Sequence, residues 1–348
     1  MALAGSTMAV AASAGSTPGL GNSRPGAGAY SLSARIPGQG GAWDDAVIDA
    51  RARKLFLAQG GVTVLDLATN TVKTAFVAGK ATHGLALLGD GTVAVDDSGT
   101  KIITIFDEKS GRILSAIPTA SYNPQNGVHA LDAMVREPLT GWLIALNGDS
   151  GLLLVVDPKK SRVIGTLALG GHAEFAVANG AGTVYINLNH GEHGEIVAVD
   201  VQLRRIVTHI ALNGCEEATG LAYDRADKLL LSVCDNGMLE AVDEGTGQAV
   251  TSIAVGRGAD GVMFDPVRRL AFVASGEDGM LSVIAVRGSR DMALVQTLGT
   301  RIGTRLGAVD DETGRVYMPS AKFGPPVPPI PYPAVLPGTF EFLVAAPP

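Results

Sequence analysis

The chain has 348 residues, a formal net charge of −7 and 45 glycines, and 46% of its residues are hydrophobic. The acidic balance and the lack of a basic cluster argue against nucleic acid as a partner. No run of 18 or more apolar residues follows the N-terminus, so we expect no membrane-spanning helix.

The first 29 residues differ in composition from the rest. Met1 to Ser16 consists of small and apolar residues, and Ala12-Ser13-Ala14 resembles a signal-peptidase site. The positively charged start of a signal peptide is missing, since the first basic residue is Arg24. We favour export to a periplasmic or secreted location with an incomplete leader; a cytoplasmic protein with a disordered tail is the alternative. Residues 1–29 are thus expected to be a leader or disordered segment, and residues 30–348 a single domain.

From Ser31 onward, short β-branched runs alternate with Gly, Asp and Asn turns, a pattern that predicts strands and hairpins. Ser31 to Ile36 is a lone strand, and units of four strands follow it. The unit from Glu216 to Gly256 shows the pattern most fully, and its four antiparallel strands are expected at 219–223, 229–233, 238–242 and 249–255.

These units repeat along the chain. An aspartate opens the last turn of five successive units: Asp66, Asp107, Asp157, Asp200 and Asp243. The aspartates are 41, 50, 43 and 43 residues apart, and a longer connection, Pro118 to Val128, accounts for the interval of 50. A period near 40 to 45 residues with four strands in each unit predicts a β-propeller. Each sheet has two apolar faces, so neighbouring sheets must stack around an axis.

We expect an all-β fold with seven blades. In chain order the first two blades lie at 43–77 and 83–117. The third runs from the end of the connection to residue 169, and the fourth from there to residue 212. The last three lie at 216–256, 260–298 and 305–344. The seventh has only three strands of its own, at 306–309, 316–318 and 339–344, the last after a proline-rich segment at 325–337. We predict that Ser31 to Ile36 supplies the missing outer strand, which closes the ring and removes an exposed sheet edge.

Two turn sequences resemble one propeller family. Val64-Leu65-Asp66-Leu67-Ala68-Thr69-Asn70 and Ala241-Val242-Asp243-Glu244-Gly245-Thr246-Gly247 are similar to the repeats of the YVTN-type, YncE-like β-propellers. The segment Arg315-Val316-Tyr317-Met318-Pro319 and the proline-rich loop extend the resemblance to about 31–344. The resemblance implies a soluble, often exported propeller and no particular reaction, because propellers host many functions.

One face of the propeller, which we call the top, carries the loops that enter the inner strands and the loops that join the second and third strands. A polar residue is expected near the top of each inner strand: Asp44, His83, Asp132, Glu174, Glu217, Asp260 and Arg305. These seven form the predicted ligand-binding ring. Carboxylates this close should have perturbed pKa values or bind a cation, and Arg305 is suited to an anionic group.

Histidines are expected on the same face. His83, His129 and His172 enter successive inner strands and are the candidate metal ligands, while His190 and His193 lie in a top loop and His209 lies on an outer strand. Imidazole with carboxylate suits a divalent metal such as zinc or copper. Interpretations without a binding site stay open. In these, the histidines only join neighbouring blades or are solvated, and Asp44 and Asp260 only cap turns.

Three functions compete. The first is an exported binding or interaction propeller, expected to be a monomer, that holds a small polar ligand, a metal or a protein partner at the top. The second is a metal-assisted hydrolase or lyase, lactonase-like, with a ring carboxylate or His83 as base. The third is a scaffold without a site. No nucleophile motif or phosphate loop is present in the sequence.

The two cysteines, Cys215 and Cys234, are both expected near the top of the fifth blade. In an oxidising compartment they would form a disulfide, and in a reducing one they would be buried free thiols. Both interpretations stay open at this point.

Overall fold

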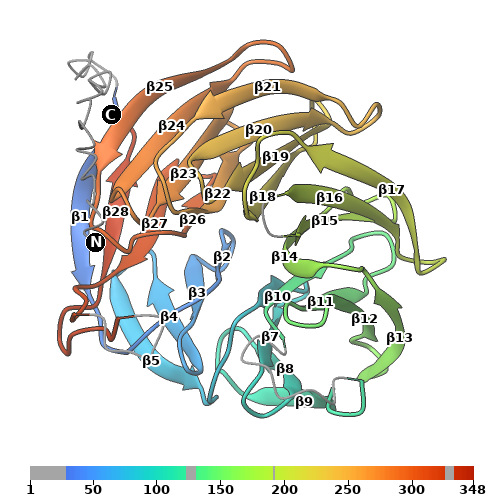
Figure 1. Cartoon of the computed structure of the whole chain (residues 1–348). Helices are drawn as coiled ribbons and strands as arrows, with labels where there is room; N and C mark the ends of the chain where they lie inside the picture. The colour runs from blue at the N-terminus through green and yellow to red at the C-terminus, as the bar shows by residue number, and fades with distance from the viewer. Residues whose placement is uncertain (1–28, 123–130, 191–192, 326–332) are drawn as a thin grey trace, which may run out of the picture.

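In the computed structural model, which describes residues 29–122, 131–190, 193–325 and 333–348, 28 strands form seven four-stranded antiparallel sheets. The sheets are arranged as blades around a central axis (Figure 1). The prediction of an all-β, seven-bladed propeller is therefore confirmed. The described residues form no helix, and so none that is long and apolar enough to cross a membrane.

Each of the first six blades is a meander of four consecutive strands. Blades one to three consist of β2 (Ala46–Asp49), β3 (Lys54–Ala58), β4 (Val62–Asp66) and β5 (Thr71–Val77); β6 (Leu85–Leu87), β7 (Thr92–Asp97), β8 (Ile102–Asp107) and β9 (Ile113–Pro118); and β10 (Ala133–Arg136), β11 (Leu143–Asn147), β12 (Leu152–Asp157) and β13 (Arg162–Ala168). Blades four to six consist of β14 (His172–Ala178), β15 (Thr183–Asn189), β16 (Gly194–Asp200) and β17 (Arg205–Leu212); β18 (Ala218–Asp224), β19 (Leu229–Cys234), β20 (Met238–Asp243) and β21 (Ala249–Ala254); and β22 (Ala259–Asp265), β23 (Leu270–Ser275), β24 (Met280–Val286) and β25 (Met292–Gly299).

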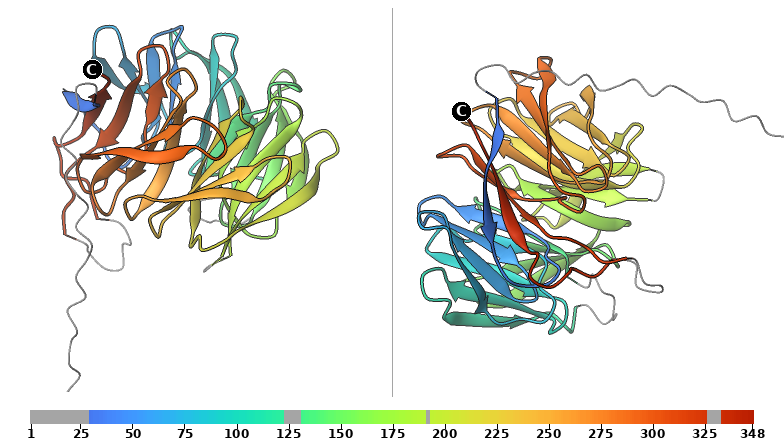
Figure 2. Two further views of the ribbon diagram at one scale, coloured as in Figure 1. Left: turned by 90° about the horizontal axis from the view of Figure 1, so that it is seen from above. Right: turned by 90° about the vertical axis from the view of Figure 1, so that its left-hand side faces the viewer.

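The seventh blade joins the two ends of the chain. Its strands from the axis outward are β26 (Ala308–Asp310), β27 (Arg315–Ser320), β28 (Glu341–Ala346) and β1 (Ser31–Pro37). β1 pairs antiparallel with β28, from Ser31 opposite Ala346 to Pro37 opposite Glu341, and the two strands run side by side at the rim (Figure 2). The predicted closure by an N-terminal strand is confirmed.

The repeated aspartates explain why the last turn forms in blades one to five. In each case the carboxylate Oδ1 accepts a hydrogen bond from the backbone N–H three residues later, as from Thr69 to Asp66 and from Thr246 to Asp243. The residue after that donor has a positive φ in all five turns: Asn70 (59°), Gly111 (74°), Ser161 (50°), Arg204 (51°) and Gly247 (67°). A turn with a local side-chain acceptor tolerates this conformation, and it returns the chain as a hairpin.

Within the described residues, seven apolar clusters lie between the blades, one at each boundary. Between blades one and two, for example, Phe56 of β3 packs on Phe106 of β8 with ring centroids 5.9 Å apart. Each fully buried side chain of this size contributes about 1.5 to 3 kcal/mol relative to an exposed one. The apolar core is therefore distributed among the boundaries between blades, and it does not fill the central axis of the propeller.

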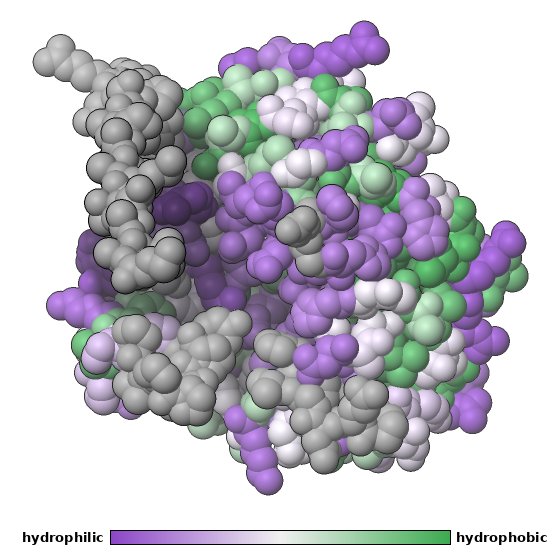
Figure 3. Space-filling model, in the orientation of Figure 1, coloured by the Kyte–Doolittle hydropathy of each residue, from purple (hydrophilic) through white to green (hydrophobic). Residues whose placement is uncertain are grey.

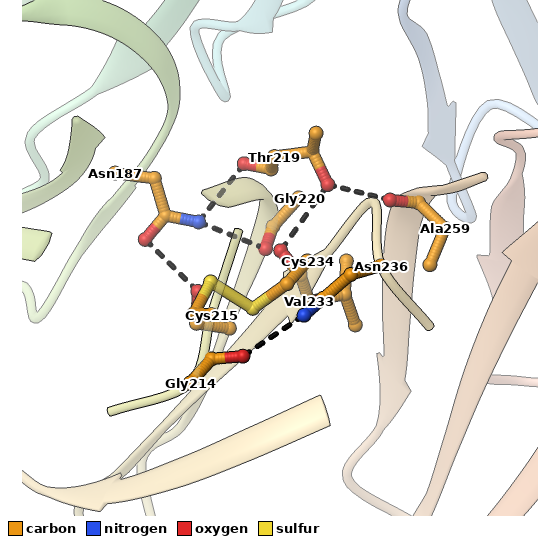
Figure 4. Close-up of a disulfide and its surroundings, with 10 residues drawn as sticks. Asn187, Gly214, Cys215, Thr219, Gly220, Val233, Cys234, Asn236 and Ala259 are labelled. Atoms are coloured by element: carbon orange, nitrogen blue, oxygen red, sulfur yellow. Dashed lines mark hydrogen bonds between the residues drawn. A yellow bond between two sulfur atoms is a disulfide. The ribbon is translucent and has the colours of Figure 1, made fainter. Parts of the chain in front are cut away.

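A disulfide joins Cys215, which precedes β18, to Cys234, the last residue of β19 (Figure 4). The structure thus selects the disulfide over the two free thiols. Nearby, the amide of Asn187 on β15 donates hydrogen bonds to the carbonyl oxygens of Thr219 (2.9 Å) and Gly220 (3.0 Å) (Figure 4). These contacts hold blade four against the start of blade five.

Candidate functional site

A ring of polar residues surrounds the top of the channel, one from each blade, at the start of the inner strand. In blades one, two, three and seven it lies one to three residues before the strand, and in blades four, five and six it lies at a register shift near the first strand residues. A β-bulge of this kind re-aims a side chain away from the regular pleat. On the face shown in Figure 3, hydrophilic residues gather over the centre, where the surface is hollowed.

The first group in the ring comprises Asp44, His83 and Asp132, from blades one, two and three. The imidazole Nδ1 of His83 lies 2.7 Å from Asp44 Oδ2 and 3.7 Å from Asp132 Oδ1. Burial of this imidazole opposes its protonation, but the hydrogen bond and negative charge of Asp44, with the charges of Asp96 and Asp132, outweigh burial and raise the pKa of His83 to about 9.

The second group shares Asp132 with the first and adds His172 and Glu174 of β14. His172 Nε2 lies 2.9 Å from Glu174 Oε1, and the amide of Asn189 donates to the same oxygen at 3.3 Å. In each group one ligand atom per residue lies within 4.8 Å of the others. Asp132 therefore stands between two histidines that come from different blades.

On the other side of the ring, Arg305 of blade seven pairs with Asp260 of blade six. Arg305 Nη1 donates to Asp260 Oδ2 at 2.7 Å. Burial raises the pKa of Asp260 to about 6, although Arg305 counteracts it, and the negative charges of Asp44, Glu174 and Asp132 raise it further. The ring carboxylates thus act on one another electrostatically across the channel.

Glu217 differs from the other six predicted ring residues in its exposure and its backbone conformation. It is exposed and has a positive φ of 52°. Burial raises the pKa of Asp235 in a neighbouring top loop, and the negative charges of Glu277 and Glu217 raise it further. Thr219 occupies the corresponding position in blade five. Its hydroxyl donates to the carbonyl oxygen of Ala259 at 2.6 Å, and a Cβ on the next residue, Gly220, would lie 2.5 Å from the carbonyl oxygen of Asp260. Blades five and six therefore approach each other too closely for a large side chain here.

Of the remaining histidines, His129 lies outside the described residues, and the other three lie within them. His190 Nε2 and His209 Nδ1 lie 2.8 and 3.1 Å from the two carboxylate oxygens of Glu195, and His193 is exposed. His209 on β17 is thus close to a top-loop histidine, although the sequence pattern placed it only on an outer strand.

Two carboxyl groups next to the ring, those of Asp96 and Asp45, were not predicted as site residues from the sequence. Asp96 on β7 is fully buried, and its Oδ1 accepts hydrogen bonds from the backbone N–H groups of His83 (3.2 Å) and Gly84 (3.1 Å). Burial raises the pKa of Asp96 to about 8 against the opposing charge of His83. Asp45 accepts from the N–H of Leu85 at 3.1 Å, and its burial raises its pKa to about 7. The only available signal was the pairing of acids in Asp44-Asp45 and Asp96-Asp97.

The two groups contain residue types that bind transition metals in proteins. Imidazole nitrogen and carboxylate oxygen are ligands of zinc, copper and iron, and metal–ligand distances near 2 Å require donor atoms that can converge. Each group places one such donor atom from each of three residues within 4.8 Å of the other two. Asp132 belongs to both groups and would be a ligand in either.

Comparisons with known proteins support the fold alone. No protein-family model matches the chain, and no curated protein sequence matches it. Among solved structures, a chain of hydrazine synthase from Kuenenia stuttgartiensis is similar, with a TM-score of 0.66 and 12% identity over 78% of this chain and 91% of that one. An identity this low shows a common propeller fold and transfers no activity.

Proposed function

We propose that this protein is a propeller that binds a divalent transition metal, zinc or copper, at the top of its channel. The observation that carries the proposal is the position of Asp132, which lies within 4.8 Å of donor atoms from Asp44 and His83 on one side and from His172 and Glu174 on the other. Mutually close carboxylates repel one another, and a cation would remove that repulsion. The protein would act as a binding platform that presents the metal, or a small polar ligand on it, to the top face.

We further propose that it is an exported, periplasmic or secreted monomer of the YVTN-type, YncE-like kind. The disulfide between Cys215 and Cys234 supports an oxidising compartment, where such bonds persist. The composition of Met1 to Ser16 supports a leader.

Titration of metal-stripped protein with zinc by calorimetry tests the metal site. Wild type should bind zinc, and Asp132→Asn should bind it at least about tenfold more weakly because both groups lose their shared ligand. A zinc excess of about a hundredfold over the dissociation constant should raise the free energy of unfolding by about 2.7 kcal/mol.

Two histidine variants complete the test. His172→Ala should weaken zinc binding, whereas His209→Ala, which removes an exposed imidazole on β17, should leave it unchanged. Zinc binding by Asp132→Asn as tight as that of wild type would contradict the proposal.

A metal-assisted hydrolase or lyase is a second candidate, and the buried carboxyl of Asp96 favours it. A carboxyl whose pKa is near 8 carries a proton at neutral pH and is able to donate it beside the ring. In this case Asp96→Asn should keep zinc affinity and lose turnover of lactone substrates by the zinc-loaded protein. Wild type that binds zinc and turns over none of a lactone panel would favour the binding platform.

A further inference from the structure

Below the ring, the channel contains a cavity of about 320 Å³ between the inner strands of blades one to four. Its wall is mainly apolar and includes Leu85, Leu87, Met134 and Phe175. A cavity of this volume lies at the small end of the range of small-molecule sites, which combine an apolar wall with a few polar groups. The polar groups here are Asp45 toward the top and Arg136 at the other end.

Arg136 is separated from the ring along a single strand. It is the last residue of β10, and Asp132 directly precedes the first residue of that strand. Four residues of extended chain span roughly 13 Å, so the guanidinium lies well below the proposed metal ligands. The two ends of β10 therefore present opposite charges to the two ends of the same channel.

The guanidinium of Arg136 makes no hydrogen bond or ion pair with any residue in the described part of the chain. The adjacent carboxylate, Glu137, is occupied by the backbone N–H groups of Leu139, Thr140 and Gly182 and by the Thr140 hydroxyl. Other half-buried arginines of the protein do have carboxylate partners, as Arg53 has in Asp310 at 2.8 Å.

The space around this guanidinium is bounded by two glycine turns. A Cβ on Gly89 would lie 4.0 Å from Arg136 Nη1, and one on Gly141 would lie 3.9 Å from Nη2. Both glycines have a positive φ, 80° and 72°, which disfavours a side chain at either position. The donors of Arg136 are thus kept uncrowded at the end of an apolar cavity.

We propose that this cavity binds a small organic carboxylate, whose anionic group forms a bidentate pair with Arg136 and whose apolar body contacts Leu87, Met134 and Phe175. The planar guanidinium fork matches a carboxylate in geometry and charge. The apolar wall favours a carboxylate with a short hydrocarbon body over a bare inorganic anion. The site does not depend on metal in the ring above it.

Calorimetric titration of the full chain in EDTA, so that the ring holds no metal, tests the proposal with hexanoate, hexan-1-ol and inorganic phosphate as probes. Hexanoate should bind, and hexan-1-ol and phosphate should each bind at least about tenfold more weakly, because each lacks one of the two recognised parts. Arg136→Met should weaken hexanoate binding by about tenfold or more, whereas Arg136→Lys should retain part of it. Arg162→Met, which removes an exposed arginine on the outer strand β13 of the same blade, is the matched control and should bind as wild type does.

A second variant tests the cavity itself. Val135→Phe places a larger side chain on the cavity wall and should reduce hexanoate binding while Arg136 stays in place. Circular dichroism of each variant checks that the propeller is folded; a misfolded Arg136→Met leaves the Val135→Phe and hexan-1-ol comparisons to decide. Equal binding of hexanoate and hexan-1-ol, of hexanoate and phosphate, or of hexanoate by wild type and a folded Arg136→Met would overturn the proposal.

Discussion

The imidazole Nδ1 of His83 lies 2.7 Å from the carboxylate of Asp44, and the two residues belong to different blades. Blade two and blade one are thus joined at the axis by a charged hydrogen bond as well as by the apolar cluster between them. Because a ring residue that is a candidate metal ligand is also a contact between blades, protonation and metal binding at the ring should both change the stability of the fold.

The first prediction is that the metal-free protein loses stability as the pH rises toward 9. Folding raises the pKa of His83 from 6.5 to about 9, so the folded state binds more protons than the unfolded state in this range. The stabilisation is fully present below pH 6.5 and is lost as the pH rises through 9, by at most about 3 kcal/mol. The raised pKa of Asp96 acts in the same direction between 3.8 and about 8. Urea denaturation at a series of pH values measures the effect.

Histidine variants test the contribution of His83. His83→Gln should flatten the dependence between pH 7 and 9, and His209→Gln, a change at an exposed histidine, should keep the wild-type slope. If His83→Gln shows the same slope as wild type, then protonation of His83 is not coupled to folding.

The second prediction concerns the disulfide. Cys215 and Cys234 are 19 residues apart and both are buried, so the bond closes a loop of about 20 residues in the unfolded chain. In the chain-entropy description, replacing both cysteines with alanine should lower the free energy of unfolding by about 3 kcal/mol. Urea denaturation with and without reductant measures it, and reductant should have no effect on the double variant.

The same variant tests how independent the ring is of this bond. The proposed metal ligands belong to blades one to four, whereas the disulfide belongs to blade five. Zinc affinity should therefore be unchanged in the folded double variant. A large loss of zinc affinity would show that the start of blade five positions the ring.

Much of the fold could be predicted because its determinants are local. In blades one to five the aspartate at the end of the third strand accepts hydrogen bonds within its own turn, so the repeat is visible in the sequence as a recurring aspartate turn. The closure by β1 followed from counting strands, since the seventh blade has only three after Arg305.

The positions of the ring residues were harder to predict from the sequence, because the regular alternation of side chains along a strand does not hold at a β-bulge. Glu174 and Asp260 lie at register shifts, and in blade five the same kind of shift brings Thr219 to the ring position, while Glu217 is exposed. Asp96 was missed because it reaches His83 from the second strand, across a contact that no sequence period reveals.

The closure of the propeller depends on β1 and on Tyr30, the residue before it. The Tyr30 hydroxyl donates to the carbonyl oxygen of Gly314 at 2.9 Å, its backbone is bound on both sides by the side chain of Gln296, and its ring packs on Phe272 of blade six with centroids 5.0 Å apart. Burial raises the pKa of this hydroxyl to about 12, so it stays protonated as a donor at neutral pH. The N-terminal segment therefore ties blade six to blade seven in addition to pairing with β28.

The last prediction is that removing residues 1–37 opens the ring, whereas removing residues 1–28 does not. The longer truncation deletes Tyr30 and β1, exposes the edge of β28 and uncovers the apolar clusters on both sides of blade seven, to which Tyr30 and Ile36 contribute. An unpaired strand edge beside newly exposed apolar surface is a template for pairing with other chains. The longer truncation should therefore melt at a lower temperature and aggregate in size-exclusion chromatography, while the shorter one should behave as wild type. A truncation at residue 37 that stays monomeric with an unchanged melting temperature would show that β1 is dispensable and that three strands suffice for blade seven.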